Sequence, residues 1–465
     1  MNTPNTAFAL SVFAGALLAA CGGGNEATRP DVGPQAAAVG ARDAHAARGV
    51  PRDAAIAAAA DAEAAVAPQA DPLATTPLAT SRPFPHHATY AAGVIKPTNV
   101  SQSAMDSKVQ SLYASWKTTY LRTAGGQGTW VKYDDGNNTV SEAHGYGMVL
   151  CAYMGDQATF DSMYGYYTRH YSTNGPHLMA WKQSLQGGVM KNVEGADSAT
   201  DGDLDIAYGL ILADSQWGSA GSVNYRQAAL DILHDILAWD VNQAHWNTNP
   251  GDWAHGSGSD DNHTRPSDFM TDHFVAFARF DTANTAKWNN VYNEVSQIVN
   301  YQFAHGSGAT GIVPDFMVLS GSNFVPVPGT YLETRHDGDF DYNACRTPWR
   351  LSMSAIVNGR TDMQAVEAKT ASWIKGTTGG VPTRIRAGYY IKNGTNGKSY
   401  VSYDDLAFTA PMAVDAMLGG SAGQSWLNSL WTSITGGDYG TTNDYYGDTI
   451  RMQVLIVVSG NWWTP

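Results

Sequence analysis

Charged residues are scarce in this chain of 465 residues, and basic ones most of all. Only 15% of the residues are charged, and 28 Lys and Arg stand against 42 Asp and Glu, which leaves a formal net charge of −14. A nucleic-acid-binding protein needs basic patches to neutralise phosphates, so this balance argues against nucleic acid as a partner. The same acidity permits a cationic polymer as substrate. The 43% of hydrophobic residues suffices for a large core.

The sequence also lacks the motifs of metal and nucleotide chemistry. It has no His-Glu-x-x-His, no Cys-x-x-Cys pair and no glycine-rich loop of the phosphate-cradling type. We therefore expect neither a metal site nor a cofactor.

No apolar run near the start is long enough to span a membrane. The run from Phe8 to Ala20 is too short and ends in small residues, which is typical of a secretory signal, although no Lys or Arg precedes it. Its ending, Leu-Ala-Ala-Cys, resembles a bacterial lipobox, which implies a lipid on Cys21. We expect residues 1–21 to direct export, giving a secreted protein or one anchored to the bacterial cell envelope.

Residues 22–82 contain almost no aromatic residues and are dominated by Ala, Pro, Gly, Asp and Arg. Such a segment cannot bury enough apolar surface to offset its ordering entropy, so we expect a disordered tether. Of the three cysteines, Cys21 is the lipidation candidate. Cys151 and Cys345 are left either as a disulfide, which an exported protein permits, or as two buried thiols.

From Ser103 onward the chain alternates helical segments with loops rich in Gly, Asn, Asp and Ser. Apolar residues such as Met105, Val109 and Leu112 recur at steps of three and four, the period of a helix with one buried face. The pattern predicts twelve helices, which begin near Ser103, Ser141, Gln157, Ala199, Ser222, Pro266, Asn284, Asn343, Met363, Leu406, Ser421 and Asp444.

Twelve helices without a run of alternating strand residues predict an all-α domain over residues 83–465. A closed double ring of six inner and six outer helices fits this count, and an α-solenoid fits it too. Polar and acidic residues gather at the starts of the even-numbered helices. In an up-down chain those starts meet at one end, where they would deliver carboxylates into one cleft, although N-capping explains some of them. The residues concerned are Glu142, Asp201, Asp203, Asp268 and Asn343.

The most specific string runs from Ala199 to Ala213, Ala-Thr-Asp-Gly-Asp-Leu-Asp-Ile-Ala-Tyr-Gly-Leu-Ile-Leu-Ala. It is a helix start with three acids in five residues, followed by small and apolar residues. Asp201 and Asp205 share one helix face at i, i+4, where like charges repel unless something binds them.

This string resembles the signature of glycoside hydrolase family 8 almost position for position. Other segments resemble the family's landmarks in the same order: Ser-Glu-Ala-His-Gly-Tyr-Gly-Met from Ser141, Leu-Met-Ala-Trp-Lys from Leu178, Val-Pro-Asp-Phe from Val313 and Arg-Thr-Pro-Trp-Arg from Arg346. The resemblance implies an (α/α)6 barrel that hydrolyses β-1,4-linked glycans with inversion. It also implies that Glu142 is the general acid and that Asp201 holds the sugar at the cleavage subsite.

The base departs from the family's common pattern, because the position of the usual Asp is Asn343, and an amide cannot accept a proton from water. A subgroup that includes chitosanases and mixed-linkage β-glucanases has Asn there and a Glu base on a preceding loop. Glu333, ten residues earlier, resembles that Glu. Asp337, Asp339 and Asp341 are the alternatives.

Aromatic side chains cover the apolar faces of sugars, so we expect some of them at the site. Trp130 and Trp181 are the preferred stacking residues, with Tyr146 and Tyr389 also near the expected cleft. Arg346 resembles a family residue beside the base. The remaining candidates for substrate binding are Asp203 and Asn343.

Taken together, the sequence predicts an exported, monomeric, inverting endo-glycosidase. The Asn343 subgroup favours chitosan or mixed-linkage β-1,3-1,4-glucan as substrate, and a cellulase-type endoglucanase is the alternative. Two rivals stay open at this point: a glycan-binding lipoprotein that has lost hydrolysis, and a polysaccharide lyase on a similar helical toroid.

Overall fold

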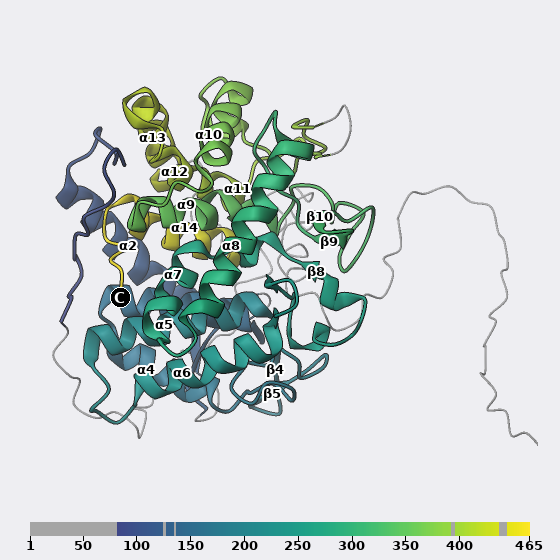
Figure 1. The fold of residues 1–465 in the computed structure, drawn as a ribbon. Coiled ribbons are helices and arrows are strands. Elements are labelled where there is room, and N and C mark those ends of the chain that lie inside the picture. Colours follow the sequence, from purple (N-terminus) through teal and green to yellow (C-terminus); the bar gives the residue numbers. More distant parts are fainter. Residues whose placement is uncertain (1–80, 124–126, 134–135, 392–395, 437–443) are drawn as a thin grey trace, which may run out of the picture. The chain divides into compact units, whose positions relative to one another are not determined.

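The computed structural model describes residues 81–123, 127–133, 136–391, 396–436 and 444–465. Within them, six helical segments form an inner ring (Figure 1). Each contacts the next, and the last contacts the first, so the ring is closed. In chain order the inner segments are α3 (Ser141–Met154), α5 (Thr200–Trp217), α7 (Thr271–Phe280), α9 (Thr347–Asn358), the pair α11 (Leu406–Thr409) and α12 (Pro411–Ala416), and α14 (Tyr445–Val458).

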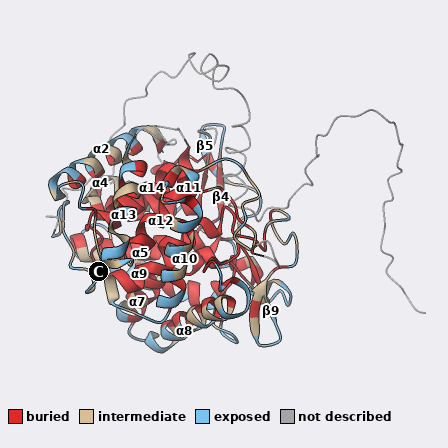
Figure 2. Ribbon diagram, turned by 90° about the horizontal axis from the view of Figure 1, so that it is seen from above, coloured by how far each residue is buried: buried red, intermediate tan, exposed pale blue. Residues whose placement is uncertain are grey.

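Six further helices pack outside this ring, each against at least one inner helix. Their exposed faces and the buried inner helices are evident in Figure 2. The outer helices are α2 (Gln102–Tyr120), α4 (Gln157–Tyr167), α6 (Tyr225–Asp235), α8 (Thr285–Gln302), α10 (Gln364–Thr378) and α13 (Gly420–Thr435). The described chain is therefore a closed double ring, as the twelve expected helix starts imply, and the α-solenoid is wrong.

The inner and outer helices differ in sequence because they differ in burial. Every residue of α14 is buried, and so is every residue of α3 except Met154, so neither helix needs a polar face. The outer helix α8 buries Trp288, Val291 and Val295 at steps of three and four and exposes other positions such as Asn289, Asn290 and Asn293.

The sequence reading missed a set of short strands in the loops. They are β1 (Leu121–Thr123), β2 (Thr129–Val131), β3 (Asn138–Val140), β4 (Lys182–Gln186), β5 (Val189–Asn192), β6 (Val241–Asn242), β7 (Asn247–Thr248), β8 (His263–Thr264), β9 (Met317–Ser320) and β10 (Asn323–Pro326). All their pairings are antiparallel, in sheets of two or three strands. With at most five residues each, they are too short to give an alternating pattern that can be read from the sequence.

Short helical segments occur in the loops, and two of them, η2 (Ile236–Asp240) and η6 (Phe303–Ser307), directly continue α6 and α8. Two more introduce inner helices, η5 (Pro266–Asp268) before α7 and η7 (Ala344–Arg346) before α9. The others are η3 (Asp252–Ala254), η4 (Asp260–Asn262) and η8 (Pro382–Arg384).

Cys151 and Cys345 are both buried free thiols, so they form no disulfide with each other. The expected signal segment 1–21 and the expected tether up to residue 80 lie outside the described residues. Among the helices that the structure describes, none combines the length and apolar character needed to cross a membrane.

Candidate active site

Glycines bring the starts of α3 and α5 into close contact. A Cβ added to Gly202 would lie 2.4 Å from Ser141 Oγ, and one added to Gly145 would lie 2.7 Å from Asp205 Cβ. Real side chains cannot approach so closely, so only glycine permits this packing. As a result Glu142, the second residue of α3, and Asp201, the second residue of α5, lie side by side at the same end of the ring.

We expect the substitution Gly202→Ala to weaken both the fold and the site, because the added methyl group meets Ser141 Oγ, Cβ and backbone carbon at 2.4–2.6 Å. Overpacking of this kind costs about 1–3 kcal/mol. Thermal unfolding should show a lower melting temperature, and kcat should fall because the helix starts move apart. Gly218→Ala is the matched control for the added methyl group, since nothing lies within 4 Å of a Cβ there, although its φ of 73° carries a strain of its own. Equal losses in both variants would contradict the packing argument.

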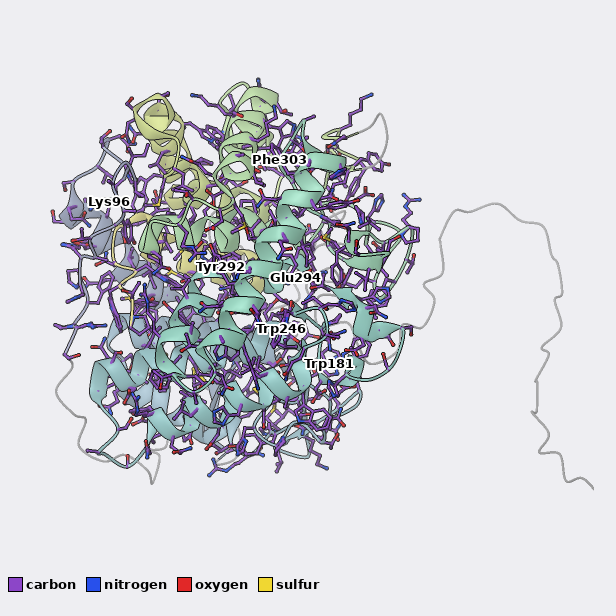
Figure 3. All side chains as sticks on the ribbon, viewed as in Figure 1. Lys96, Trp181, Trp246, Tyr292, Glu294 and Phe303 are labelled. Atoms are coloured by element: carbon purple, nitrogen blue, oxygen red, sulfur yellow. The ribbon has the colours of Figure 1, made fainter. Side chains whose placement is uncertain are left out.

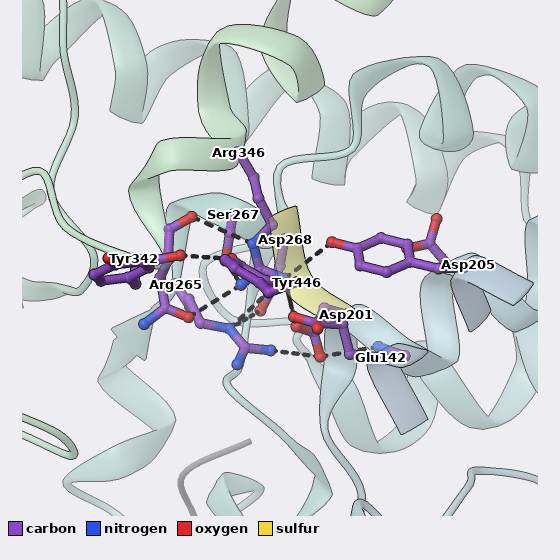
Figure 4. A network of polar contacts seen from close by, with 12 residues as sticks. Glu142, Asp201, Asp205, Arg265, Ser267, Asp268, Tyr342, Arg346 and Tyr446 are labelled. Atoms are coloured by element: carbon purple, nitrogen blue, oxygen red, sulfur yellow. Dashed lines mark hydrogen bonds and ion pairs between the residues drawn. The ribbon is translucent and has the colours of Figure 1, made fainter. Parts of the chain in front are cut away.

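Arg346 joins the two carboxylates. Its Nη1 donates to Glu142 Oε2 at 2.6 Å and to Asp201 Oδ2 at 2.9 Å (Figure 4). Its Nη2 donates to Ser267 Oγ at 2.9 Å and to Asn343 Oδ1 at 3.0 Å. The guanidinium is completely buried, so these contacts act with little screening by water.

A second buried arginine extends this network. Arg265 Nη2 lies 2.9 Å from Asp201 Oδ1, and its Nε donates to Asp268 Oδ1 at 3.0 Å. The charges therefore alternate from Asp268 through Arg265, Asp201 and Arg346 to Glu142. Each arginine is shared by two carboxylates, which makes the position of every member depend on its neighbours.

The environment separates the pKa values of the two helix-start carboxylates. Burial is the main cause that raises the pKa of Glu142 to about 7, and the Asp201 anion adds to it, against the opposing effects of Arg346 and of a hydrogen bond from Tyr445. Burial also works to raise the pKa of Asp201, but Arg265 and Arg346 outweigh it and hold that pKa at about 2. One carboxyl that keeps its proton near neutrality beside one that is always ionised is the arrangement required of a general acid and an electrostatic partner.

The repulsion expected between Asp201 and Asp205 is offset by separate partners for the two carboxylates. Asp205 accepts from His273 Nε2 at 2.9 Å and from Arg350 Nη1 at 3.1 Å. Each carboxylate on this helix face thus has its own cationic or hydrogen-bonding partners.

Glu333 enters the same network through Asn343. Asn343 Nδ2 donates to Glu333 Oε1 at 2.9 Å, while Asn343 Oδ1 accepts from Arg346. Three successive hydrogen bonds therefore lead from Glu333 through Asn343 and Arg346 to Glu142. Two glutamates that lie 191 positions apart in the sequence are thus connected through one hydrogen-bonded network. Glu333, at 9% exposure, is the more accessible of the two, since Glu142 is 3% exposed.

Asp337 organises the loop that carries Glu333. Its carboxylate accepts the backbone N–H groups of four successive residues, from Tyr331 to Thr334, at 2.7–3.0 Å. Asp339 accepts from Ile391 N and His336 Nδ1. Two of the three alternatives for the base, Asp337 and Asp339, are thus occupied in holding loops. The third, Asp341, donates its backbone N–H to Asp315, and Glu333 is the loop acid that bonds to Asn343.

We expect Asp337→Ala to reduce kcat at least tenfold while changing KM less. Hydrogen bonds to a charged acceptor contribute about 1.5–3 kcal/mol each, so losing four of them lets the loop and Glu333 leave their positions. Steady-state kinetics on a soluble β-glucan would measure this. Asp362→Ala, which removes an exposed acid paired with Arg360, is the matched control and should leave kcat unchanged. Unaltered kcat in Asp337→Ala would mean that this loop does not position the base.

Asp315, within the Val-Pro-Asp-Phe landmark, fixes the turn before α9. Its two oxygens accept the backbone N–H groups of Asp341, Asn343 and Ala344 at 2.7–3.1 Å, and Oδ2 also accepts from Asn343 Nδ2 at 3.3 Å. The orientation of the Asn343 amide between Glu333 and Arg346 follows from these contacts.

The aromatic candidates divide into two groups. The peptide oxygen of Trp181 accepts from Ser141 N, next to Glu142, and Figure 3 marks this side chain on the side of the molecule where the strands lie. Tyr146 Oη lies 3.4 Å from Arg346 Nη1, within the network. All four side chains belong to the core, with 4% of the surface exposed for Trp181, 0% for Tyr146, 2% for Trp130 and 1% for Tyr389. Because a buried ring offers no face to a sugar, we retain none of them as a stacking residue, and Trp181 and Tyr146 differ from the other two only in their contacts with the site.

Asp203 also has a role other than the expected one. It accepts the backbone N–H of Met179 at 2.8 Å and is completely buried, and burial raises its pKa well above its usual range. It holds the segment that leads to Trp181, so it acts on the site through that segment and makes no contact with Arg346 that would place it in the network.

Sequence reasoning did not single out three members of the site. Tyr445 Oη donates to Glu142 Oε1 at 2.9 Å, Arg265 binds Asp201, and Ser267 accepts from Arg346. Tyr445 is the first residue of α14, the twelfth helix expected from the sequence. Because this helix is even-numbered, its start was expected at the same end of the ring as Glu142. Arg265 and Ser267 lie close to Asp268, in the segment before α7. No sequence pattern identified them as site residues.

In the described ranges, no group of three or more His, Cys, Asp or Glu side chains is arranged to hold a metal ion. The carboxylates of the site are partnered instead by arginine, by Tyr445 and by Asn343. The arrangement as a whole can donate a proton from Glu142 and accept one at Glu333.

Comparison with known proteins identifies the family of this chain. Residues 82–459 match the model of the glycosyl hydrolases family 8. The chain is 46% identical over 391 residues to a beta-glucanase of Niallia circulans, a match that covers 83% of this chain and 92% of the relative. It is 32% identical over 406 residues to an endoglucanase of Bacillus sp. (strain KSM-330), covering 83% and 82%.

A solved structure agrees as well. The apo beta-1,3-1,4-glucanase from Paenibacillus sp. X4 superposes with a TM-score of 0.79 at 44% identity, covering 83% of this chain and 100% of that one. A cold-adapted family 8 xylanase, at 18% identity and a TM-score of 0.65, shares the fold, covering 84% of this chain and 98% of the xylanase. The rival interpretations as a lyase and as a binding protein without hydrolytic activity are therefore set aside, and the chain belongs to the glycosyl hydrolases of family 8, as an endo-acting glycoside hydrolase.

Proposed function

We propose that this protein hydrolyses mixed-linkage β-1,3-1,4-glucan with inversion, and that it belongs to the subgroup of the family with Asn at the usual base position. The observation that carries the proposal is the hydrogen-bonded path from Glu333 through Asn343 and Arg346 to Glu142. The printed names of two relatives, a beta-glucanase and a beta-1,3-1,4-glucanase, favour this polymer over others.

In the proposed reaction Glu142 protonates the glycosidic oxygen as the bond to the anomeric carbon breaks. A water on the opposite face of the sugar attacks that carbon and gives its proton to Glu333, so one proton is donated and one is accepted in each turnover. Asn343 holds the Glu333 carboxylate through its amide N–H. Asp201, ionised between Arg265 and Arg346, binds the sugar at the cleavage subsite and stabilises positive charge that develops on the ring.

Chitosan is the second candidate substrate, because the same subgroup includes chitosanases and because the chain carries a net charge of −14. Attraction between an acidic protein and glucosamine units is screened by salt. Chitosan cleavage by this protein should therefore fall as the ionic strength rises, whereas cleavage of a neutral glucan should not.

The test is a panel of soluble substrates, namely lichenan, chitosan, carboxymethyl-cellulose and xylan, with reducing ends measured at low and high salt. We expect lichenan to give the highest kcat/KM. Proton NMR of the first products should show the α-anomer, because inversion of a β-linkage gives it. A β-anomer as first product would refute inversion, and preference for carboxymethyl-cellulose would assign the protein to the cellulase type.

For the cellular location, we propose an exported monomer that is secreted or held at the cell envelope by a lipid on Cys21, with residues 22–82 as a disordered tether. The support is the short apolar run and the Leu-Ala-Ala-Cys sequence before Gly22. Metabolic labelling with a radioactive fatty acid should label the wild type and leave Cys21→Ser unlabelled. Label in both proteins would refute lipidation at this residue.

A further inference from the structure

Two stacked side chains lie beside the loop that carries Glu333. The ring of Tyr331 lies flat against that of His263, with 3.9 Å between the ring centroids and an angle of 3° between the planes. The Tyr331 hydroxyl donates to Asp260 Oδ1 at 3.1 Å, and Phe316 makes a T-shaped contact with the Tyr331 ring at 5.5 Å. Burial lowers the pKa of His263 below its usual range, so the imidazole stacks as a neutral ring at pH 7. We call the stacked pair of His263 and Tyr331 the aromatic clasp.

Tyr331 and Glu333 belong to one tight turn. Asp337 accepts the backbone N–H groups of Tyr331 and Glu333 at 2.7 and 3.0 Å, together with those of Leu332 and Thr334. Because these groups converge on a single carboxylate, the turn moves as a unit, and a shift of the Tyr331 ring carries Glu333 with it. The hydrogen bond from Asn343 holds one oxygen of Glu333, whereas the aromatic clasp holds the chain two residues away.

His263 is fixed to the opposite side of the site. It lies in β8, which pairs with β9. Two residues further along the chain, Arg265 binds Asp201 Oδ1 at 2.9 Å. The aromatic clasp therefore joins two loops, and each of its rings comes two residues before a member of the site, Glu333 on one side and Arg265 on the other.

We propose that the aromatic clasp sets the position of Glu333 relative to Asp201, so that Tyr331 and His263 are positioning residues for hydrolysis. This inference rests on the proposed role of Glu333 as the base. Inversion requires one water between the base and the sugar, so a base that moves with its loop loses that water. A misplacement of about 1 Å can lower a rate by about 10²-fold. Since the rings act through Glu333 and not on the sugar, they should affect kcat more than KM.

A double-mutant cycle in the full chain tests the contact, with Tyr331→Leu, His263→Ala and the double variant. We expect each single substitution to lower kcat on lichenan at least about tenfold and to change KM less than about threefold. Because either change opens the same contact, the double variant should lose little more than the worse single variant. Tyr331→Phe and His263→Phe each keep a flat neutral ring and should retain most of the wild-type kcat.

The stacked pair of Tyr301 and His305 provides the matched controls. Its ring centroids are 4.1 Å apart, on the outer helix α8 and on the segment η6 that continues it. Tyr301→Leu and His305→Ala remove the same kind of contact without touching the loop of Glu333, so they should leave kcat unchanged. Melting temperatures of all variants separate a loss of stability from a loss of activity.

Azide supplies a readout that a merely structural role would not change. It attacks without giving up a proton, so it needs no base and should restore turnover to Tyr331→Leu as α-glycosyl azide, with Glu142 still protonating the leaving group. The proposal would be overturned by multiplicative losses in the cycle, by a rise in KM with kcat unchanged, or by rescue of Glu333→Gln without rescue of Tyr331→Leu. Failure to rescue Glu333→Gln itself would instead refute Glu333 as the base, and the role of the aromatic clasp would fall with it.

Discussion

Replacing Glu333 by Gln is expected to lower kcat on a soluble β-glucan by roughly 10²–10⁴-fold, the range that general acid–base groups contribute. The substitution keeps the size of the side chain but removes its ability to take a proton from water. The variant should remain folded, since the partner of Glu333 Oε1 is the Asn343 amide and the Gln carbonyl oxygen can accept the same hydrogen bond. Steady-state kinetics and the melting temperature measure the two effects separately.

Azide distinguishes a base from a residue that merely holds the loop. A small anion needs no deprotonation, so azide should restore activity to Glu333→Gln and give an α-glycosyl azide, the product of attack on the face opposite the leaving group. Asp337→Ala is the informative comparison, because it disturbs the same loop but keeps the carboxylate of Glu333 in the protein. Rescue of Asp337→Ala with a failure to rescue Glu333→Gln would transfer the role of base away from Glu333.

The helical framework could be predicted from sequence because local signals specify it. The apolar period marked the buried face of outer helices such as α2, and the small and apolar residues of the Ala199–Ala213 string indicated a buried helix. The parity of acidic helix starts correctly placed Glu142, Asp201 and Asp268 at one end, where they share Arg265 and Arg346.

Other parts of the site depend on contacts that sequence does not encode locally. The loop of Glu333 takes its shape from four backbone N–H groups converging on Asp337, a geometry that no spacing rule reveals. Trp130 and Trp181 both border loops in the sequence, and only packing shows that both rings are in the core and that the backbone of Trp181 contacts the start of α3. Arg265 was missed because a single arginine in a loop has no pattern.

The raised pKa of Glu142 predicts the second large effect, which is a loss of activity at alkaline pH. Glu142 has to carry a proton in the active enzyme, and its pKa is raised to about 7, mainly by burial. We therefore expect kcat/KM to fall about tenfold per pH unit as the pH rises above 7. In Glu142→Gln, activity on natural glucan should drop by roughly 10²–10⁴-fold, and the alkaline limb that Glu142 causes should disappear. Oligosaccharide glycosides with a dinitrophenyl leaving group, which needs no protonation, should be largely spared.

Tyr445→Phe tests the assignment of that limb, because it leaves both catalytic carboxylates in place. The Tyr445 hydroxyl donates to Glu142 Oε1 at 2.9 Å and so stabilises the ionised form, which lowers the pKa of Glu142. Without the hydroxyl the proton is held more tightly, and the alkaline limb should move to higher pH by roughly one to two units, since a hydrogen bond to a charged group is worth about 1.5–3 kcal/mol and one pKa unit is about 1.4 kcal/mol. The pH profile of kcat/KM measures the shift. A limb that stays in place, or moves to lower pH, would mean that a group other than Glu142 controls it.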